Sequence, residues 1–326
     1  MKRFFIIGAI FGFGAAAIIV PAFLRSQKDS KISVTTEEAP EKYPLLAKRI
    51  FVDNPNDIII DFTKLRNQLK GYAVEGNVRY GIYFEYLPTG VYIGVNERET
   101  FYRASLIKVP IVMKAYKLKE EGKIRKDEIL PITRDDIDRG YGSLGNEGRS
   151  EIAFTEAIKL ILTKSDNTAF KVVNRRVNKE IEEQGDEVEK AIIDVFDYLD
   201  IPRDESGETE ALTARNYSSI MKSLFFSAYL NYENSNEILS ILGESEFTDW
   251  MPEPIPDDII VAHKTGIFDI EESIYSVHSD CGIVYYPNRP YLQCIMVNSA
   301  DPKTSLKIIR EISKMIYDYM DSISGQ

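Results

Sequence analysis

Residues 101–108 read Phe-Tyr-Arg-Ala-Ser-Leu-Ile-Lys, and this stretch sets a serine three residues ahead of a lysine. If a helix begins at Ser105, Lys108 lies one turn along on the same face, where its amine can reach the Ser105 oxygen. The helix start also places backbone N–H groups where they stabilise a developing oxyanion. The stretch therefore predicts a nucleophile, its base and an electrophilic site within one turn. Pro110 fits this helix only with a local kink.

Two further motifs follow along the chain, Ser165-Asp-Asn167 and Lys264-Thr-Gly266. The first separates two helical patterns, and the second ends an apolar run that is typical of a strand. Alone, each motif has an ordinary explanation: a capping serine, a helix–helix turn or a solvent-exposed lysine. All three in this order favour one active site built on a serine nucleophile.

The two histidines of the chain are poorly placed for a Ser-His-Asp arrangement. His263 precedes Lys264 on the predicted strand, so the alternation of side chains sends it to the opposite face. His278 lies in a polar stretch without a Gly-x-Ser-x-Gly elbow. A lysine is the better base, because burial and a second cation both lower the pKa of an amine.

Together the motifs resemble those of the penicillin-recognising serine enzymes, specifically the class A β-lactamases and the related penicillin-binding proteins. The resemblance covers about residues 58–322 and includes a first hairpin at 83–96, a last hairpin at 280–297 and a closing helix at 303–320. It implies an α/β (α+β) fold of the β-lactamase/transpeptidase type. We expect an antiparallel sheet flanked by helices, with an opening helix at 62–72 and an inserted all-helical lobe at about 115–215.

The resemblance also implies catalytic roles for four motif residues. Ser105 would be the acylated nucleophile, and Lys108 its general base or proton relay. Ser165 would pass the proton to the leaving nitrogen, while Asn167 would hold Lys108 and the substrate amide.

Substrate binding would fall to the third motif and its neighbours. Lys264 would set the field around Ser165 and attract a substrate carboxylate, which the Thr265 hydroxyl would bind. The N–H groups of Ser105 and Ile267 would form the oxyanion hole, and Gly266 would let substrate approach the strand closely. Tyr141 would line the mouth of the groove, although packing on its own loop neighbours fits it equally well.

Two departures from class A β-lactamases bear on the reaction. The stretch 199–213 has no Glu-x-x-x-Asn pair to hold a deacylating water, and Glu205, Glu208 and Glu210 are candidates by composition only. Short acidic loops usually carry solvated carboxylates. The stretch 267–276 has no arginine to assist carboxylate binding, which would then depend on Lys264, Thr265 and Ser276.

The favoured hypothesis is a DD-peptidase-like serine acyl-enzyme that acts on D-Ala-D-Ala-type stem peptides of peptidoglycan and is acylated by β-lactams. One alternative is a class A β-lactamase that hydrolyses these antibiotics. A second alternative is a β-lactam or wall-peptide receptor without turnover. No cofactor and no metal are expected, since two cysteines and two histidines scattered along the chain do not make a zinc site.

The start of the chain predicts a membrane anchor. Lys2-Arg3 precede an uncharged run at 4–24, which is long enough to span a bilayer. We expect an uncleaved anchor over 1–25, a flexible stalk over 26–48 and a catalytic domain over 49–326, outside the cytoplasm. Ala15-Ala-Ala17 keeps a cleaved signal peptide open as an alternative.

The composition of the chain limits its possible partners and indicates a folded core. The net charge of -11 argues against a nucleic-acid partner, and 44% hydrophobic residues suffice for a sizeable core.

Cys281 and Cys294 lie on the two arms of a hairpin that turns at 287–290. Counting outward from that turn places them diagonally rather than opposite one another, so we expect two free buried thiols.

Overall fold

The computed structural model of the chain describes residues 60–183, 190–202, 211–269 and 276–323. The predicted anchor and stalk, together with Glu205, Glu208 and Glu210, lie outside these ranges. Within them, each helix is either too short or too polar to cross a bilayer.

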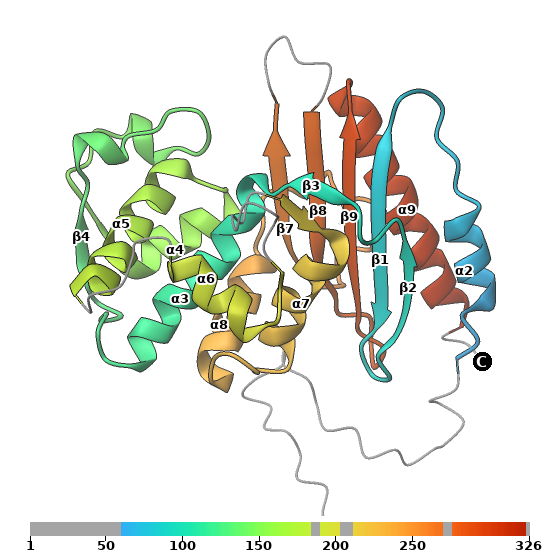
Figure 1. Cartoon of the computed structure of the whole chain (residues 1–326), viewed down its shortest axis with the longest axis horizontal. Coiled ribbons are helices and arrows are strands. Elements are labelled where there is room, and N and C mark those ends of the chain that lie inside the picture. Colours follow the sequence, from blue (N-terminus) through green and yellow to red (C-terminus); the bar gives the residue numbers. More distant parts are fainter. Residues whose placement is uncertain (1–59, 184–189, 203–210, 270–275, 324–326) are drawn as a thin grey trace, which may run out of the picture. The chain divides into compact units, whose positions relative to one another are not determined.

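A five-stranded antiparallel sheet with the order β2-β1-β9-β8-β7 forms the centre of the fold (Figure 1). Its strands are β1 (Arg79–Tyr86), β2 (Val91–Val95), β7 (Val261–Phe268), β8 (Ser276–Val284) and β9 (Tyr291–Ser299). Strand β7, which carries the Lys-Thr-Gly motif, is an edge strand. One side of this motif is therefore open to the helical part of the molecule. The predicted fold class is confirmed.

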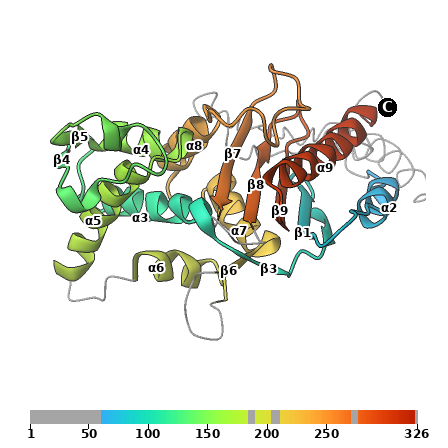
Figure 2. The same cartoon turned by 90° about the horizontal axis from the view of Figure 1, so that it is seen from above.

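Helices cover both faces of this sheet. On one face lie α2 (Thr63–Lys70) and α9 (Pro302–Ser322), and on the other lies α7 (Ala214–Phe225), which α8 (Tyr232–Leu242) joins (Figure 2). The side chain of Asp301 caps α9 by accepting from the N–H groups of Lys303 and Thr304. The expected first and last helices are therefore present within two residues of their predicted ends.

The helical lobe is inserted between β2 and β7 of the main sheet. It contains α3 (Lys108–Glu120), α4 (Phe154–Thr163), α5 (Asn167–Glu183) and α6 (Lys190–Tyr198), with a small sheet of β4 (Ile129–Pro131) and β5 (Glu151–Ala153). Strand β3 (Thr100–Tyr102) precedes the lobe and pairs with β6 (Ala211–Thr213), which follows it. The chain therefore enters and leaves the lobe at one neck, directly before Ser105.

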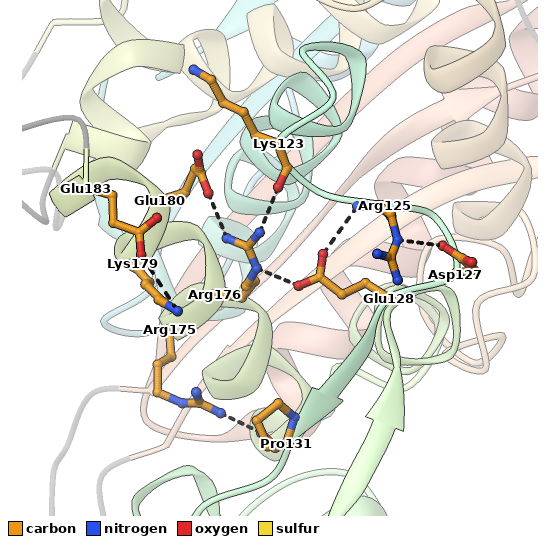
Figure 3. Close-up of polar contacts among 10 residues, drawn as sticks. All are labelled: Lys123, Arg125, Asp127, Glu128, Pro131, Arg175, Arg176, Lys179, Glu180 and Glu183. Atoms are coloured by element: carbon orange, nitrogen blue, oxygen red, sulfur yellow. Dashed lines mark hydrogen bonds and ion pairs between the residues drawn. The ribbon is translucent and has the colours of Figure 1, made fainter.

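Arg176 fixes α5 to the segment that leads into β4 (Figure 3). Its guanidinium donates to Glu128 Oε1 at 2.7 Å, to the Lys123 carbonyl at 2.7 Å and to Glu180 Oε2 at 3.1 Å. Glu128 in turn accepts from the Arg125 N–H at 3.2 Å. Because α5 begins at Asn167, this network also fixes the helix that presents the Ser-Asp-Asn motif.

The expectation of two free thiols is wrong, because Cys281 and Cys294 form a disulfide. They are direct partners in the β8–β9 ladder, with a Cα–Cα distance of 3.9 Å. The last pair of the ladder is Val284 with Tyr291, so Tyr285 and Tyr286 belong to the connection rather than to the strands. The longer connection changes the pairing and brings the cysteines face to face.

Candidate active site

Ser105 lies in a tight turn that leads into α3. Residues Ala104–Ile107 form a 3₁₀ helix, and the α-helix starts at Lys108. Pro110 falls in the first turn of α3, where its missing N–H breaks no helical hydrogen bond. The predicted kink therefore takes the form of a change from 3₁₀ to α-helix at Lys108.

The Ser105 turn packs against the edge strand of the sheet. A Cβ on Gly266 would lie 3.0 Å from Leu106 Cγ and 3.5 Å from the Arg103 carbonyl, so only glycine allows this approach without a shift. Ser105 itself remains partly exposed, between two neighbours of which Leu106 is fully buried. The nucleophile predicted from sequence is thus held beside β7 and reachable from solvent.

Two lysines converge on the hydroxyl of Ser165. Lys108 Nζ donates to Ser165 Oγ at 3.1 Å, and Lys264 Nζ donates to the same oxygen at 2.9 Å. Lys108 also donates to the Ser165 carbonyl at 2.6 Å and to Asn167 Oδ1 at 2.7 Å. Lys264 makes its other hydrogen bond to the Thr265 carbonyl at 2.9 Å. The structure therefore brings together residues from all three sequence motifs.

Burial makes both amines easier to deprotonate. Lys108 is 2% exposed and Lys264 is 1% exposed. Burial lowers the pKa of Lys108 to about 8, against the attraction of Asp166 and Asp138. Burial also lowers the pKa of Lys264 well below its usual value, and the nearby charge of Lys108 lowers it further. Two ammonium groups on one buried hydroxyl repel each other, so loss of a proton from the pair is favoured.

The expected hydrogen bond from Lys108 to the Ser105 oxygen is not formed. Within the described residues, the three N–H donors of the Lys108 ammonium already have three acceptors on Ser165 and Asn167. The ammonium form is thus fully occupied by the Ser-Asp-Asn motif. A neutral amine would give up one of these bonds and gain a lone pair that can accept a proton.

The backbone at Ser165 is in the left-handed region, with φ at 55°. This conformation is uncommon for a residue with a side chain and is typical of functional turns. The buried Asp166 stabilises the turn, because its carboxylate accepts from the Ala169 N–H at 2.8 Å and from the Leu144 N–H at 2.9 Å. The first bond caps α5, and the second ties the turn to the loop that contains Tyr141.

Asn167 is oriented by a second carboxylate. Its Nδ2 donates to Asp138 Oδ1 at 3.2 Å, which leaves Oδ1 turned toward Lys108. A salt bridge with Lys171 at 2.9 Å holds Asp138 and, as the largest contribution, lowers the pKa of its carboxyl. Asp138 is therefore ionised at neutral pH and fixes which end of the amide faces the lysine.

Aromatic rings border the lysine pair. Tyr141 stacks on Phe247 with ring centroids 5.9 Å apart, so it does not pack only on its own loop. Lys264 Nζ lies 5.7 Å from the centre of the Phe247 ring. Backbone hydrogen bonds tie the segments that carry these rings to the Ser165 turn. The Asn167 N–H donates to the Tyr141 carbonyl at 3.0 Å, and the N–H of Glu246, the residue before Phe247, donates to the Thr163 carbonyl at 3.0 Å. Tyr141 thus lies next to the Ser165 turn, and its role at the mouth of a substrate groove stays a prediction.

His263 takes no part in this cluster. It lies on the other face of β7, as predicted, where its Nδ1 contacts Asp280 Oδ1 at 2.8 Å. Thr265 shares that face, and its buried Oγ1 has no hydrogen-bond partner among the described residues. Among those residues there is also no group of His, Cys, Asp and Glu side chains suited to a metal ion.

Sequence reasoning missed several supporting residues. Asp138 and Phe247 reach the site only because the fold brings together segments distant in sequence. The hydrogen bond from the Leu144 N–H to the Asp166 carboxylate depends on the fold in the same way. Phe247 lies in an otherwise polar stretch and Asp138 in an acidic one, so neither has a local signal.

Comparisons with known proteins agree with this geometry. The family model described as "Beta-lactamase enzyme family" matches residues 64–320. No curated protein matches the chain. Among solved structures, PBP-A is 25% identical with a TM-score of 0.67, and the match covers 80% of this chain and 97% of that one.

Two further structures extend the comparison. A point variant of PBP-A, solved as an acyl-enzyme complex with penicillin G, is 25% identical with a TM-score of 0.65, over 80% of this chain and 96% of that one. The TLA-1 extended-spectrum β-lactamase shares the fold at 20% identity and a TM-score of 0.68, over 79% of this chain and 98% of that one. The family match spans most of the chain and includes all three motifs. The chain therefore belongs to the β-lactamase enzyme family and is a serine hydrolase.

Proposed function

We propose that this protein is a penicillin-binding, DD-peptidase-like enzyme in which Ser105 forms an acyl-enzyme with D-Ala-D-Ala-type stem peptides and with β-lactams. The observation that carries the proposal is the pair of buried lysines on one serine hydroxyl, Lys108 and Lys264 on Ser165 Oγ. The penicillin G acyl-enzyme of the PBP-A variant supports the same chemistry.

The contacts suggest a route for the proton. A neutral Lys108 takes the proton of the Ser105 hydroxyl as its oxygen attacks the carbonyl carbon. The amide N–H of Ser105 and that of Ile267 stabilise the resulting oxyanion. Lys108 then returns the proton through Ser165 to the leaving nitrogen. Ser165 Oγ accepts from both lysines, so its own O–H remains available as the donor.

The sequence favours a peptidase over a lactamase at the second step. A deacylating water needs a positioned base, and the stretch 199–213 lacks the Glu-x-x-x-Asn pair that provides one in class A enzymes. The two nearby carboxylates that act on Lys108 are already engaged, Asp166 by backbone N–H groups and Asp138 by Lys171. We therefore propose that the β-lactam adduct on Ser105 is long-lived.

Intact-mass measurement during incubation with penicillin G tests the proposal. We expect one adduct per chain, with a lifetime much longer than the turnover time of a true β-lactamase. The Ser105→Ala variant should form no adduct. Release of D-alanine from a D-Ala-D-Ala peptide then identifies a peptidase. Absence of any adduct on the wild-type protein contradicts the proposal.

The second candidate is a class A β-lactamase, which the family match favours. Its deacylating carboxylate would come from Glu205, Glu208 or Glu210. Rapid loss of the adduct, abolished by one of three single Glu→Gln substitutions, would establish this function instead. A lasting adduct without D-alanine release would favour a receptor.

We also propose that the catalytic domain lies outside the cytoplasm and is tethered by residues 1–25. The apolar run at 4–24 and the disulfide between Cys281 and Cys294 support this location, because disulfides persist mainly in oxidising compartments. Fractionation of cells that express the full chain, followed by protease treatment of intact spheroplasts, tests the placement. Protection of the domain from protease would contradict it.

A further inference from the structure

A chain of polar contacts leads from the surface of α5 to Lys108. The Lys171 ammonium lies 2.9 Å from Asp138 Oδ2, and the Asn167 amide donates to Asp138 Oδ1 at 3.2 Å. Lys108 in turn donates to Asn167 Oδ1 at 2.7 Å. Lys171 lies one turn beyond Asn167 on the same face of α5. One carboxylate therefore contacts both a surface cation and the residue that holds Lys108.

The Asp138 carboxylate is held in place by its own loop. The Gly140 N–H donates to Asp138 Oδ1 at 2.9 Å. The backbone of Asp138 is bound as well, because its N–H donates to Thr168 Oγ1 and its carbonyl accepts from the same hydroxyl, both at 2.9 Å. A Cβ on Gly145 would lie 2.3 Å from the Asp138 carbonyl oxygen, so the loop packs closely at this point. The negative charge of Asp138 is therefore held at a fixed place beside Asn167.

Three charged side chains act on Lys108 in the described part of the chain: Asp166, Asp138 and Lys264. The Asp166 carboxylate is bound by backbone N–H groups, and Lys264 is buried. Asp138 differs from both, because the side chain of its partner Lys171 is 44% exposed. The effect of Asp138 on Lys108 thus depends on a second side chain that can be changed without opening the buried site.

Other cations on this side of α5 have partners away from the active site (Figure 3). Arg175 and Lys179 line a groove together with Lys171. Arg175 binds Asp136 at 2.9 Å, and Lys179 lies 3.7 Å from Glu183. The groove also contains two carboxylates, Asp135 and Glu182. Lys171 differs from the other two cations because its partner also contacts Asn167.

We propose that Asp138 and Lys171 are positioning residues for acylation, which act on Lys108 through Asn167 and through their opposite charges. This assignment rests on the proposed function, in which a neutral Lys108 takes the proton of the Ser105 hydroxyl. Burial lowers the pKa of Lys108 most, and the charge of Asp138 raises it. The charge of Lys171 opposes that of Asp138. The pair therefore sets the pH at which the base becomes active.

The pH profile of acylation by penicillin G tests the assignment. In the wild-type protein the rate should reach half its maximum near pH 8. Asp138→Asn removes the negative charge and keeps an oxygen that accepts from Asn167, so the midpoint should fall by about half a pH unit or more. Lys171→Gln leaves Asp138 ionised at these pH values, so the midpoint should rise, by less because Lys171 is partly exposed. The midpoint of the double variant should lie between those of the single variants.

A further variant separates orientation from charge. Asp138→Ala removes both the charge and the acceptor for Asn167 Nδ2. Its midpoint should match that of Asp138→Asn, whereas its maximal rate at high pH should be about tenfold lower, the loss that one hydrogen bond explains. A salt bridge with a merely structural role would not shift the midpoint in opposite directions when either of its two members is removed.

Two controls use the same helix. Lys171→Arg keeps the cation and should keep the wild-type midpoint. Lys179→Gln removes a cation about two turns farther along α5, where the side chain is 68% exposed, and should leave the profile unchanged.

An NMR titration of Lys108 in the protein without ligand measures the same midpoints independently of acylation. The chemical shift of its Cε carbon reports the titration, and loss of the signal in Lys108→Arg identifies it. If the wild-type protein forms no adduct, the proposed function fails and the NMR titration still decides the role of the pair. Midpoints that move in the same direction in Asp138→Asn and Lys171→Gln, or that stay at the wild-type value, would overturn the assignment.

Discussion

At the scale of single residues, the amine of Lys108 determines how acylation depends on pH. Its pKa is lowered to about 8 because the side chain is buried. A general base acts in its deprotonated form, so the acylation rate should rise with pH and reach half its maximum near pH 8. Stopped-flow or mass measurements of the Ser105 adduct between about pH 6 and pH 9.5 record this profile.

A matched variant identifies the group that titrates. Lys108→Arg keeps a cation beside Ser165 and Asn167 but cannot lose its proton in this range. The acylation rate of this variant should be lower than that of the wild type by at least about a hundredfold, and it should not rise near pH 8. A wild-type profile that is flat, or that falls as pH increases, would exclude Lys108 as the base.

Ser165 combines a functional hydroxyl with a strained backbone. Both Ser165→Gly and Ser165→Ala remove the oxygen that the two lysines share, so both should acylate about a hundredfold more slowly or worse. Glycine adopts the observed φ of 55° freely, whereas alanine does not. Ser165→Gly should therefore be more stable than Ser165→Ala by about 1 kcal/mol in urea unfolding. Equal stability would mean that the turn relaxes in the variants.

Site residues that lie in short sequence motifs can be predicted, whereas those placed by distant contacts cannot. Ser105, Lys108, Ser165 and Lys264 lie in short motifs whose order along the chain is itself informative. Phe247 and Asp138 contact site residues that are far away in sequence, so their local sequence does not mark them. The spacing of Ser105 and Lys108 predicts a lysine beside the serines, but the hydrogen bonds of Lys108 to Ser165 and Asn167 depend on how α3 packs against α5.

At the scale of elements, the loop before η4 (Leu144–Asn146) and the start of α5 form one unit. Gly142 has a φ of +92°, and a Cβ there would lie 2.2 to 2.5 Å from atoms of Asp166. Gly142→Ala should therefore displace Asp166 and cost about 2–4 kcal/mol, from overpacking together with backbone strain. Acylation should fall with it, because Asp166 holds the turn that presents Ser165.

Gly148→Ala is the control for this substitution. Gly148 also has a positive φ, +67°, but the position that a Cβ would take there has no neighbouring atom within 4 Å. The substitution should cost only about 1 kcal/mol and leave acylation intact. If both variants lose the same stability and activity, strain alone and not contact with Asp166 explains the effect.

Pairing between strands shows where sequence reasoning fails at this scale. The positions of the β8–β9 hairpin and of α9 are predictable, because apolar alternation and helical spacing extend over many residues. The register is not, since it depends on where the connection between β8 and β9 begins. Two residues more in that connection convert a diagonal pair of cysteines into direct partners.

At the scale of the whole molecule, the central sheet separates two hydrophobic cores but belongs to both. Ile82 and Phe84 face the core beneath α9, whereas Tyr83 between them faces the core that extends into the helical lobe. Cys281 and Cys294 also belong to the second core. Because alternate residues of the same strands line the two cores, neither core can lose its packing without disturbing the other.

This coupling predicts a single unfolding transition for the described part of the chain. Trp250 is the only tryptophan of the protein and lies in the core beneath α9, where Ser313 donates to the carbonyl of the adjacent Met251. Its fluorescence therefore reports on the α9 side, while far-UV circular dichroism reports mostly on helices α3 to α8, which pack into the core on the other side of the sheet. The two probes should give coincident denaturation curves.

Removal of the disulfide tests the coupling directly. The bond closes a loop with a sequence separation of 13 and lies in the core on the lobe side, so Cys281→Ala with Cys294→Ala should destabilise the protein by about 3 kcal/mol. If the sheet couples the cores, the fluorescence curve of Trp250 shifts by the same amount as the dichroism curve, although Trp250 belongs to the other core. A shift confined to the dichroism signal would show that the lobe unfolds independently.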